Sequence, residues 1–420
     1  MRFVASLLTV VAMLIFAHGT CVAKAPKGWV EIELDGQPFP TPRWQANGHS
    51  YGFAETLCIW KGGEYSKIYS PDNEPIAPVS FNTPTGLAVA CMIGGRMVVQ
   101  TTPKADKTFL VNGSEVVALT HEDGTPLKPR LTAAMGSTDC PYFVADKAIY
   151  RVKENVAAKV DFPEGVAYVL HTYVNSQLVV AFGKKYWVYE NDKPVRLKDD
   201  QGNDFKDVTA VELRGIGAHL FVKFSETWRP YLLDGTTLKP VDIGSGSVRD
   251  IDEFDGRPIM TVESSSVGVP MGVDSTKAVK LEGFAGIENA DWTFESQGKY
   301  AFAWTSGALY TYDGKGVSKV KLEDGWRFST STWGNDDLWR AFGALGAGYV
   351  LVRVDTDEKW KIQLVDAGGK VKTIFSHVPS DTVAVELQTD TALNGVFLLK
   401  NIDDQKNDRY SSEYYFYEFK

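Results

Sequence analysis

A short hairpin pattern recurs along almost the whole 420-residue chain, and this repetition constrains the fold more than any other feature. Each copy is a strand-like run, an Asn, Asp or Gly turn, and a second run in which apolar and polar residues alternate. Asn-Gly and Asp-Gly pairs tolerate the positive φ of a tight type I′ turn, so each copy predicts a β-hairpin. The residues that open the turns are Asp35, Asp72, Asn112, Glu154, Asn191, Asp234, Asp274, Asp313 and Asp366.

The repeat has a period of roughly 40 residues. Successive turns are separated by 37, 40, 42, 37, 43, 40, 39 and 53 residues. Two further strand-like runs lie between hairpins, for example VTAVELRG at 208–215 and HLFVKF at 219–224, so each unit holds four strands. No long helical pattern interrupts the series, which disfavours βαβ folds. A β-sandwich has no reason to repeat at this interval.

This period and unit resemble the β-propeller superfamily over residues 27–420. The resemblance implies an all-β ring, and the hairpins indicate eight four-stranded blades, with seven or nine as alternatives. The N-terminal run WVEIELDG (29–36) and the C-terminal run YYFYEFK (414–420) would close the ring by pairing in one sheet. We expect residues 26–420 to form a single domain. The blade motifs of the WD40, kelch and sialidase types are absent, so no specific propeller family is indicated.

The first 25 residues have the pattern of a secretory signal peptide. A short positive start precedes an apolar run at residues 3–16, and Ala23-Lys24-Ala25 fits the small-x-small cleavage pattern. The apolar run is shorter than the ~20 residues that a membrane-spanning helix needs. We therefore expect cleavage after Ala25 or Ala23 and export to the periplasm or extracellular space, without membrane insertion after cleavage. A membrane anchor and lipidation at Cys21 are the less favoured alternatives.

The mature chain would be acidic. Cleavage would remove two basic residues, Arg2 and Lys24, and no acid, which takes the formal net charge from −9 to −11. An acidic protein has no electrostatic reason to bind nucleic acid or an anionic membrane. We expect a monomer without a cofactor, whose charge chiefly keeps it soluble.

Three cysteines would remain after cleavage, namely Cys58, Cys91 and Cys140. Export permits disulfides, and an odd number leaves at least one thiol unpaired. Cys58 and Cys91 fall on expected strands of neighbouring repeats, which makes them the candidate disulfide. The cysteines form no CxxC pair and the histidines are scattered singly, so we expect no metal site.

An aromatic-rich insertion at residues 326–348 makes the last full repeat the longest, at 53 residues. Asn335 and the two acids that follow it would cap a short helix over 337–345. Propellers carry function on the loops around their central channel, where such an insertion would form a binding platform. The alternative is that its aromatic residues pack onto their own blades. The candidate ligand-binding residues are Trp333, Trp339, Asp336 and Asp337.

Acidic residues gather at three further places. Residues 199–204 and 403–408 offer oxygen ligands for calcium, but neither matches the D-x-[DN]-x-[DN]-G loop. Asp250 and Asp252 alternate on an expected strand and so share a face, where paired carboxylates can perform acid/base hydrolysis. Solvated loops and a polar strand face explain these patterns more simply. The chain lacks a G-x-S-x-G elbow, and no catalytic residue is assigned.

These patterns favour a secreted or periplasmic propeller that is a non-enzymatic binding module for a protein or a cell-surface glycan. The alternative is a propeller hydrolase or lyase that acts on a sugar or lactone, assisted by calcium. A structural part of an envelope assembly is the third candidate. An enzyme would present channel-facing acids or histidines with perturbed pKa values, whereas a binder would present an aromatic or apolar patch.

Overall fold

Turn residues with a left-handed backbone explain why the repeated segments fold as hairpins. In the computed structural model, Gly113, Asp192 and Gly235 have φ values of 61°, 65° and 57° within turns that the sequence predicts. Asn112 lies opposite Glu115 across the Gly113 turn, and the two strands continue as an antiparallel pair. Glycine, asparagine and aspartate adopt this region with least strain, so the turn chemistry sets the strand boundaries.

The structure describes a large part of the chain in separate stretches. These are residues 28–32, 43–46, 48–53, 56–61, 64–76, 89–93, 96–100, 107–127, 141–145, 148–160, 170–206, 209–254, 256–264, 267–281, 283–284, 294–297, 300–305, 308–321, 327–328, 338–345, 348–354, 360–365, 370–377, 382–390, 395–404 and 409–418.

The described residues form strands and no helix. The strands fall into consecutive series along the chain. The first four series are β2 (Arg43–Ala46), β3 (His49–Phe53), β4 (Leu57–Lys61) and β5 (Glu64–Lys67); β6 (Val89–Ile93), β7 (Arg96–Gln100), β8 (Thr108–Asn112) and β9 (Glu115–Leu119); β10 (Tyr142–Ala145), β11 (Ala148–Lys153) and β12 (Val156–Val160); and β13 (Leu170–Val174), β14 (Gln177–Phe182), β15 (Lys185–Glu190) and β16 (Lys193–Arg196).

The later series continue in the same way. They are β17 (Glu212–Ile216), β18 (His219–Phe224), β19 (Thr227–Asp234) and β20 (Thr237–Pro240); β21 (Ser247–Phe254), β22 (Arg257–Ser264), β23 (Val267–Asp274) and β24 (Lys277–Lys280); β25 (Phe294–Gln297), β26 (Tyr300–Thr305), β27 (Ala308–Tyr312) and β28 (Val317–Lys319); β29 (Arg327–Phe328), β30 (Leu338–Leu345), β31 (Gly348–Val354), β32 (Trp360–Val365) and β33 (Val371–His377); and β34 (Thr382–Asp390), β35 (Gly395–Asp404) and β36 (Arg409–Glu418), which are joined by β1 (Trp29–Glu31).

Within each series the strands pair mainly with their neighbours in sequence, and the pairing is antiparallel apart from the short β29–β30 contact. The described strands form eight sheets. One of these has eight strands, because the β17–β20 series joins the β21–β24 series through the Trp228–Val248 pair. The sheets number eight, as the sequence suggests for the blades, only when these two series count as one.

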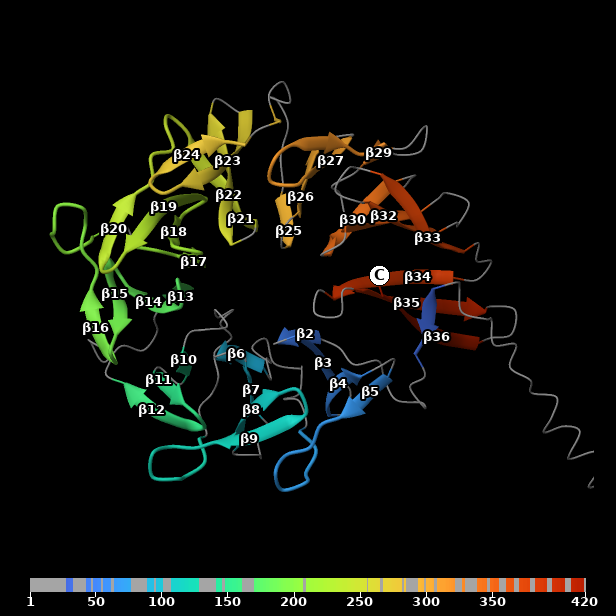
Figure 1. Ribbon diagram of the computed structural model, residues 1–420, viewed down its shortest axis with the longest axis horizontal. Coiled ribbons are helices and arrows are strands. Elements are labelled where there is room, and N and C mark those ends of the chain that lie inside the picture. Colours follow the sequence, from blue (N-terminus) through green and yellow to red (C-terminus); the bar gives the residue numbers. More distant parts are fainter. Residues whose placement is uncertain are drawn as a thin grey trace, which may run out of the picture.

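The sheets lie side by side around a common centre (Figure 1). First strands such as β17, β21 and β25 lie nearest the centre, and last strands such as β16, β20 and β24 lie at the periphery. This radial arrangement of small antiparallel sheets is that of a β-propeller. The all-β architecture expected from the repeat is therefore confirmed.

The two ends of the described chain share a sheet. Strand β1 pairs antiparallel with β36, with Trp29 opposite Tyr417 and Glu31 opposite Tyr415. The indole Nε1 of Trp29 also donates a hydrogen bond to the carbonyl oxygen of Ile374, 2.8 Å away on β33. An N-terminal strand thus supplies the outer edge of the C-terminal sheet and contacts the sheet before it.

Apolar side chains fill the spaces between neighbouring sheets. Tyr186 and Val188 of β15, with Leu197 after β16, pack against Leu220 and Val222 of β18, and all five are buried. Trp187 and Phe221, which alternate with them along these strands, are also buried and belong to other core clusters, so both faces of these strands are covered. The order of the sheets around the centre therefore follows from burial as well as from chain connectivity.

Two local expectations from the sequence are wrong. Asp72 does not open a hairpin between two strands of one sheet, because it lies in a loop that follows β5. The hairpin of that series is instead β4 with β5, in which Lys61 lies opposite Glu64. Pro71 and Pro75 flank Asp72, and proline cannot donate to a strand ladder, which limits pairing there to the single Tyr69–Pro75 bridge.

The helix expected over 337–345 is also wrong, because Leu338–Leu345 is strand β30. It pairs with β31, with Ala341 opposite Leu351 and a register shift before Ala344. A helix of eight or nine residues is marginal by itself. Pairing with the β-branched run of β31 satisfies the same backbone groups in a sheet.

Candidate functional site

The structure does not bring the four predicted ligand-binding residues together. Trp333, Asp336 and Asp337 lie outside the described residues. Trp339 lies on β30, opposite Arg353 of β31 and beside Phe328 of β29 in register. The binding platform in this insertion therefore stays a prediction.

The Cys58–Cys91 disulfide likewise stays a prediction. Cys58 lies on β4, is buried, and donates its thiol hydrogen to the carbonyl oxygen of Thr56 at an Sγ–O distance of 3.4 Å. Cys91 lies on β6, in the next sheet along the chain, and Cys140 lies outside the described residues.

The acidic stretch at 199–204 folds as a closed loop. The Asp199 carboxylate accepts hydrogen bonds from the backbone N–H groups of Gln201 and Asn203, at 3.0 and 2.8 Å. The Asp204 carboxylate accepts a hydrogen bond from the Lys198 ammonium at 2.5 Å, which lowers the pKa of Asp204. Both carboxylates are thus occupied in forming the loop rather than turned toward a shared point.

Asp250 and Asp252 lie on β21, a strand whose label is close to the centre in Figure 1. Each lies near an arginine: Asp250 Oδ2 is 3.8 Å from Arg249 Nε, and Asp252 Oδ1 is 3.7 Å from Arg214 Nη2. In the described part of the chain, no group of three or more His, Cys, Asp and Glu side chains is arranged to hold a metal ion.

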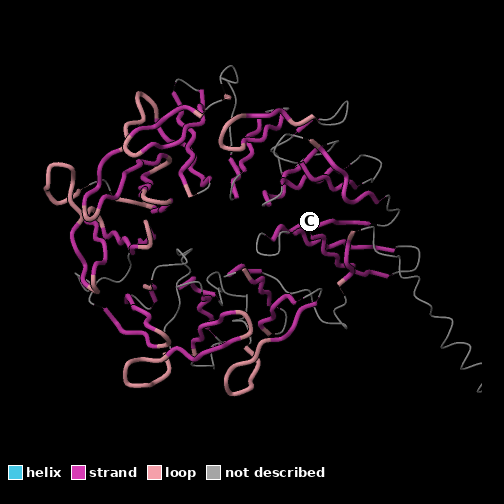
Figure 2. The backbone as a smooth tube through the Cα atoms, in the orientation of Figure 1, coloured by secondary structure: helices cyan, strands magenta, loops and turns pink. Residues whose placement is uncertain are grey.

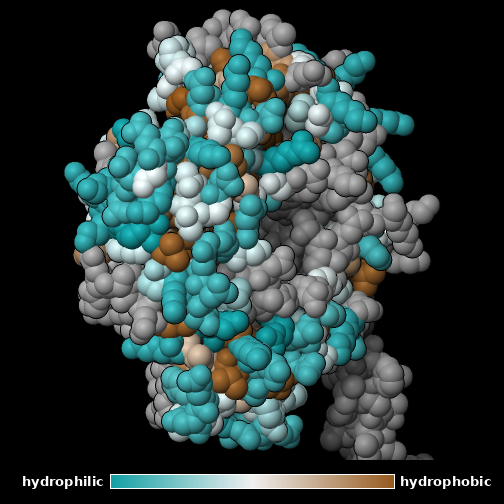
Figure 3. Space-filling model, turned by 60° about the vertical axis from the view of Figure 1, so that its left-hand side comes forward, coloured by the Kyte–Doolittle hydropathy of each residue, from teal (hydrophilic) through white to brown (hydrophobic). Residues whose placement is uncertain are grey.

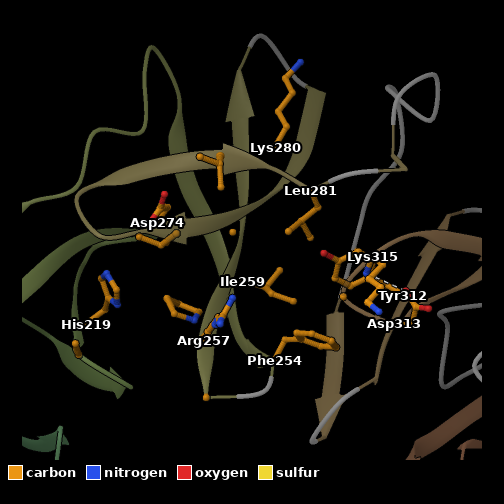
Figure 4. Close-up of a pocket in the computed structure, with 17 residues that line it drawn as sticks. His219, Phe254, Arg257, Ile259, Asp274, Lys280, Leu281, Tyr312, Asp313 and Lys315 are labelled. Atoms are coloured by element: carbon orange, nitrogen blue, oxygen red, sulfur yellow. Dashed lines mark hydrogen bonds between the residues drawn. The ribbon is translucent and has the colours of Figure 1, made fainter.

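A pocket of about 920 Å³ lies where the short turns of three neighbouring series meet. We call it the inter-sheet pocket, and Figure 4 shows its lining. Its walls come from the β17–β18, β21–β22, β23–β24 and β27–β28 connections. These connections share one face of the molecule, because strands one to two and three to four of an antiparallel series turn at the same end. The lining residues used below are His219, Phe254, Arg257, Ile259, Val279, Lys280, Leu281, Tyr312, Asp313 and Lys315.

The floor of the inter-sheet pocket is apolar. Ile259 of β22 and Tyr312 of β27 are buried and belong to one packed cluster with Phe254 and Leu281. The rings of Phe254 and Tyr312 lie 5.3 Å apart, and Figure 4 shows Ile259 and Leu281 beside them. The cluster bridges the β21–β24 and β25–β28 series, so the sheet-to-sheet core continues directly into the pocket.

One glycine shapes the wall beside this floor. Gly314 has a φ of 86°, and a Cβ atom there would lie 3.2 Å from Phe254 Cε1. Asp313 completes the turn by accepting hydrogen bonds from the backbone N–H groups of Lys315 and Gly316, each at 2.9 Å, and these bonds lower the pKa of the Asp313 carboxyl. The Asp313 carboxylate is therefore ionised at neutral pH, and its hydrogen bonds stabilise the turn.

Three cations stand around the apolar floor: Arg257, Lys280 and Lys315. All three are exposed, and no ion pair joins any of them to a carboxylate among the residues that the structure describes. His219 is buried at the far end, with its Nε2 2.8 Å from the carbonyl oxygen of Ser275, so its ring braces the β23–β24 turn. The pocket thus combines apolar depth with three cations, set against the carboxylates of Asp274 and Asp313 in the same lining.

Val279 is exposed beside these cations. It is one of five large apolar side chains that stand exposed on the described part of the protein, at 40%. Hydrophilic residues predominate among the described residues on the side turned forward in Figure 3. Sequence analysis missed this site, although the lysines clustered at 277–280 and 315–321 were a visible signal.

The described residues contain no helix that is long and apolar enough to cross a membrane. No protein-family model and no curated protein sequence matches the chain.

Among solved structures, the chain is similar to PorZ, a surface component of the type-IX secretion system of Porphyromonas gingivalis, with 10% identity and a TM-score of 0.30 over 89% of this chain. The chain spans about half of PorZ, covering 54% of it. The dihydro-heme d1 dehydrogenase NirN matches with 16% identity and a TM-score of 0.39, over 83% of this chain and 77% of that one. AztD of Citrobacter koseri matches with 12% identity and a TM-score of 0.36, over 79% of this chain and 92% of that one.

Proposed function

We propose that this chain is an exported, non-enzymatic binding module, and that its ligand occupies the inter-sheet pocket. The ligand is a protein segment or a cell-surface glycan, in keeping with the class that the sequence favours. The pocket supports this proposal because an apolar floor and a few directional charged groups are the usual make-up of a ligand site. The single observation that carries it is the meeting of the Ile259–Tyr312 floor with the cations Arg257, Lys280 and Lys315.

We propose further that residues 26–420 form one closed ring. Its support comes from the contact between the first and last sheets. The Trp60 ring of β4 lies 5.1 Å from the rings of both Phe397 and Phe416, on β35 and β36. With β1 paired to β36, the sheets on either side of the chain ends are then in direct contact. Counting each strand series as one blade makes the proposed propeller nine-bladed, an alternative to eight that the hairpin count allows.

Export is the third part of the proposal, and it rests on the signal-peptide pattern of residues 1–25. The mature protein recovered from the periplasm or medium is expected to begin at Pro26. N-terminal sequencing measures this directly, and an intact Met1 on the exported protein would contradict it.

The binding proposal is tested with the mature chain and one exposed apolar residue. Wild-type protein and the Val279→Glu variant are screened on a glycan array and against a library of random peptides. Because Val279 is exposed, a charge there is tolerated by the fold but disturbs the apolar rim of the pocket. The matched control is Val211→Glu, which places the same change at a residue 59% exposed and outside the pocket lining.

We expect ligands that the wild type and Val211→Glu both retain and that Val279→Glu loses, with equal melting temperatures for all three proteins. Ligands that all three proteins retain equally would place binding elsewhere, and Trp333→Ala and Trp339→Ala then test the insertion. A screen without any retained ligand overturns the binding proposal.

A further inference from the structure

We propose that the inter-sheet pocket takes an acidic peptide segment that carries one large apolar side chain. This inference rests on the proposed binding function and names the chemistry of its ligand. It follows from three features of the pocket: the charge around it, the groups that line it, and the strand edge beside it.

The β23–β24 hairpin beside the pocket differs in its charges from the hairpin before it. In the β19–β20 hairpin, the ammonium of Lys239 lies 2.7 Å from the Asp234 carboxylate and neutralises it. By register, the residue of the β23–β24 hairpin that corresponds to Lys239 is Val279, since Asp234 lies opposite Thr237 and Asp274 opposite Lys277.

Replacing a paired lysine by valine has two effects at this position. The hairpin gains an exposed apolar side chain, and the Asp274 carboxylate loses the lysine that pairs with Asp234 in the β19–β20 hairpin. Lys280, Arg257 and Lys315 also line the pocket, so its cations outnumber its carboxylates, Asp274 and Asp313, by three to two. In a chain of net charge −9, three such cations around one pocket attract an anionic partner locally while the rest of the molecule repels it.

The lining favours a peptide over a sugar. Among the described residues that line the pocket, none has an amide side chain and the only hydroxyl is that of Tyr312. The His219 Nε2 and the Asp313 carboxylate already make hydrogen bonds to the protein. The lining donors that remain are the cations Arg257, Lys280 and Lys315, which form stronger, charge-assisted hydrogen bonds with carboxylates than with the neutral hydroxyl groups of a sugar. A leucine or phenylalanine side chain instead buries against Ile259 and Leu281, with flanking carboxylates on the cations.

A strand edge beside the pocket suits the peptide backbone. Ala278 N–H donates to the Asp242 carbonyl oxygen at 2.8 Å, on the side of β24 away from β23. Along a strand, the backbone N–H groups of every second residue point to the same side. By the same alternation the Lys280 N–H faces outward, and no described residue accepts a hydrogen bond from it. Beyond the Asp242 contact, an extended peptide can form backbone hydrogen bonds with this edge of β24, as in peptide recognition by strand addition.

The test uses fluorescein-labelled octapeptides and the mature protein in a polarisation assay. The acidic probe has the sequence EDELFEDE. Its neutral counterpart is QNQLFQNQ, and EDESSEDE keeps the charge but lacks the apolar pair. Protein variants are Arg257→Glu and Lys280→Glu, with Lys159→Glu as the matched control, because Lys159 is an exposed lysine on β12 far from the pocket lining.

We expect EDELFEDE to bind, and each of the two other peptides to bind at least about tenfold more weakly, the ordinary effect of losing a charged or an apolar anchor. Arg257→Glu and Lys280→Glu should each weaken the binding of EDELFEDE by a similar factor, whereas Lys159→Glu should leave its affinity unchanged. Affinity should also fall as ionic strength rises from about 50 to 300 mM, because salt screens exposed charges.

Equal binding of the acidic and neutral peptides overturns the inference. So does a glycan from the array that loses binding with Val279→Glu while no peptide binds, although the proposed function then stands. If neither a peptide nor a glycan depends on Val279, both the inference and the proposed function fail.

Discussion

Gly215 marks a place where one sheet approaches the next too closely for any side chain. A Cβ atom on Gly215 of β17 would lie 1.8 Å from the carbonyl oxygen of Tyr173 on β13. The Gly215 N–H also donates to Thr172 Oγ1, 2.9 Å away on the same strand of the neighbouring sheet. The close approach and the hydrogen bond together set the distance between these two sheets.

Gly215→Ala is therefore expected to lower the free energy of unfolding by about 2 kcal/mol or more, because the added methyl group forces the sheets apart. Chemical denaturation measures the change. Gly316→Ala is the control, since a Cβ there would have no atom within 4 Å. Equal stability of the two variants would show that the sheets can separate freely at Gly215.

Tyr142 ties the third series to the fourth through a polar contact. Its hydroxyl donates to Asp192 Oδ1 at 2.9 Å, and Arg151 Nη1 donates to Asp192 Oδ2 at 2.6 Å. Burial, and next the hydrogen bond to Asp192, raise the pKa of Tyr142 above its usual value of 10.0. A raised tyrosine pKa contributes stability that is present below the unfolded pKa and lost as pH rises through the folded pKa.

The wild-type protein should consequently lose stability above about pH 10. Tyr142→Phe removes one titrating group, so its decline between neutral and alkaline pH should be shallower, while it loses about 1 kcal/mol at pH 7 with the hydrogen bond. Denaturant titrations at several pH values measure both effects. Tyr69→Phe, at a residue that is 45% exposed, is the control, and a slope identical to the wild type for Tyr142→Phe would refute the assignment.

Among the structural elements, short backbone bridges at the outer strand edges connect one strand series to the next. Thr120, Lys198 and Asp242 each form a parallel bridge to the outermost strand of the next series, with Val156, Thr237 and Lys277 as partners. Two compact loops begin at Thr120 and Lys198 and a third begins at Tyr69 after β5, and such loops project at the periphery in Figure 2. Each loop ends in a large apolar residue that is buried, namely Ile76, Leu127 and Phe205.

Leu127→Ala tests whether such a loop is anchored by its last residue. Leu127 is fully buried, and its carbonyl oxygen accepts a hydrogen bond from Thr108 Oγ1 at 3.0 Å. Removing its side chain should lower the free energy of unfolding by about 2–5 kcal/mol, the usual range for buried leucine. Glu122→Gln, at the exposed tip of the same loop, should be close to neutral. Thermal unfolding of both variants measures this difference. A small change in stability for Leu127→Ala would mean that the loop is only loosely attached.

At the scale of the whole molecule, the C-terminal strand carries the contact between first and last sheets. Strand β36 pairs with both β1 and β35, and its Phe416 packs on Trp60 of β4. Deletion of residues 414–420 should therefore lower the melting temperature of the entire protein rather than of one sheet. Removal of residues 419–420 alone, beyond the end of β36, is the control. A full deletion variant that melts like the wild type would contradict the proposed ring.

Much of the architecture was accessible before any tertiary structure. The hairpin turns at Asn112, Glu154, Asn191, Asp234, Asp274 and Asp313 were predicted from local chemistry, and the structure places each between the paired strands expected. Positive φ and strand alternation depend on residues close in sequence, so a single chain suffices to predict them.

The amino-acid sequence by itself determined the strands, their turns and the repeating sheet, because these follow from local backbone preference and a period of two. Only the tertiary structure decided that residues 338–345 pair as a strand, that the β17–β20 and β21–β24 series join at Trp228, and that Val279 meets Arg257 and Lys315 around an apolar floor. These features depend on contacts between segments far apart in the chain, where packing and backbone pairing outweigh local preference.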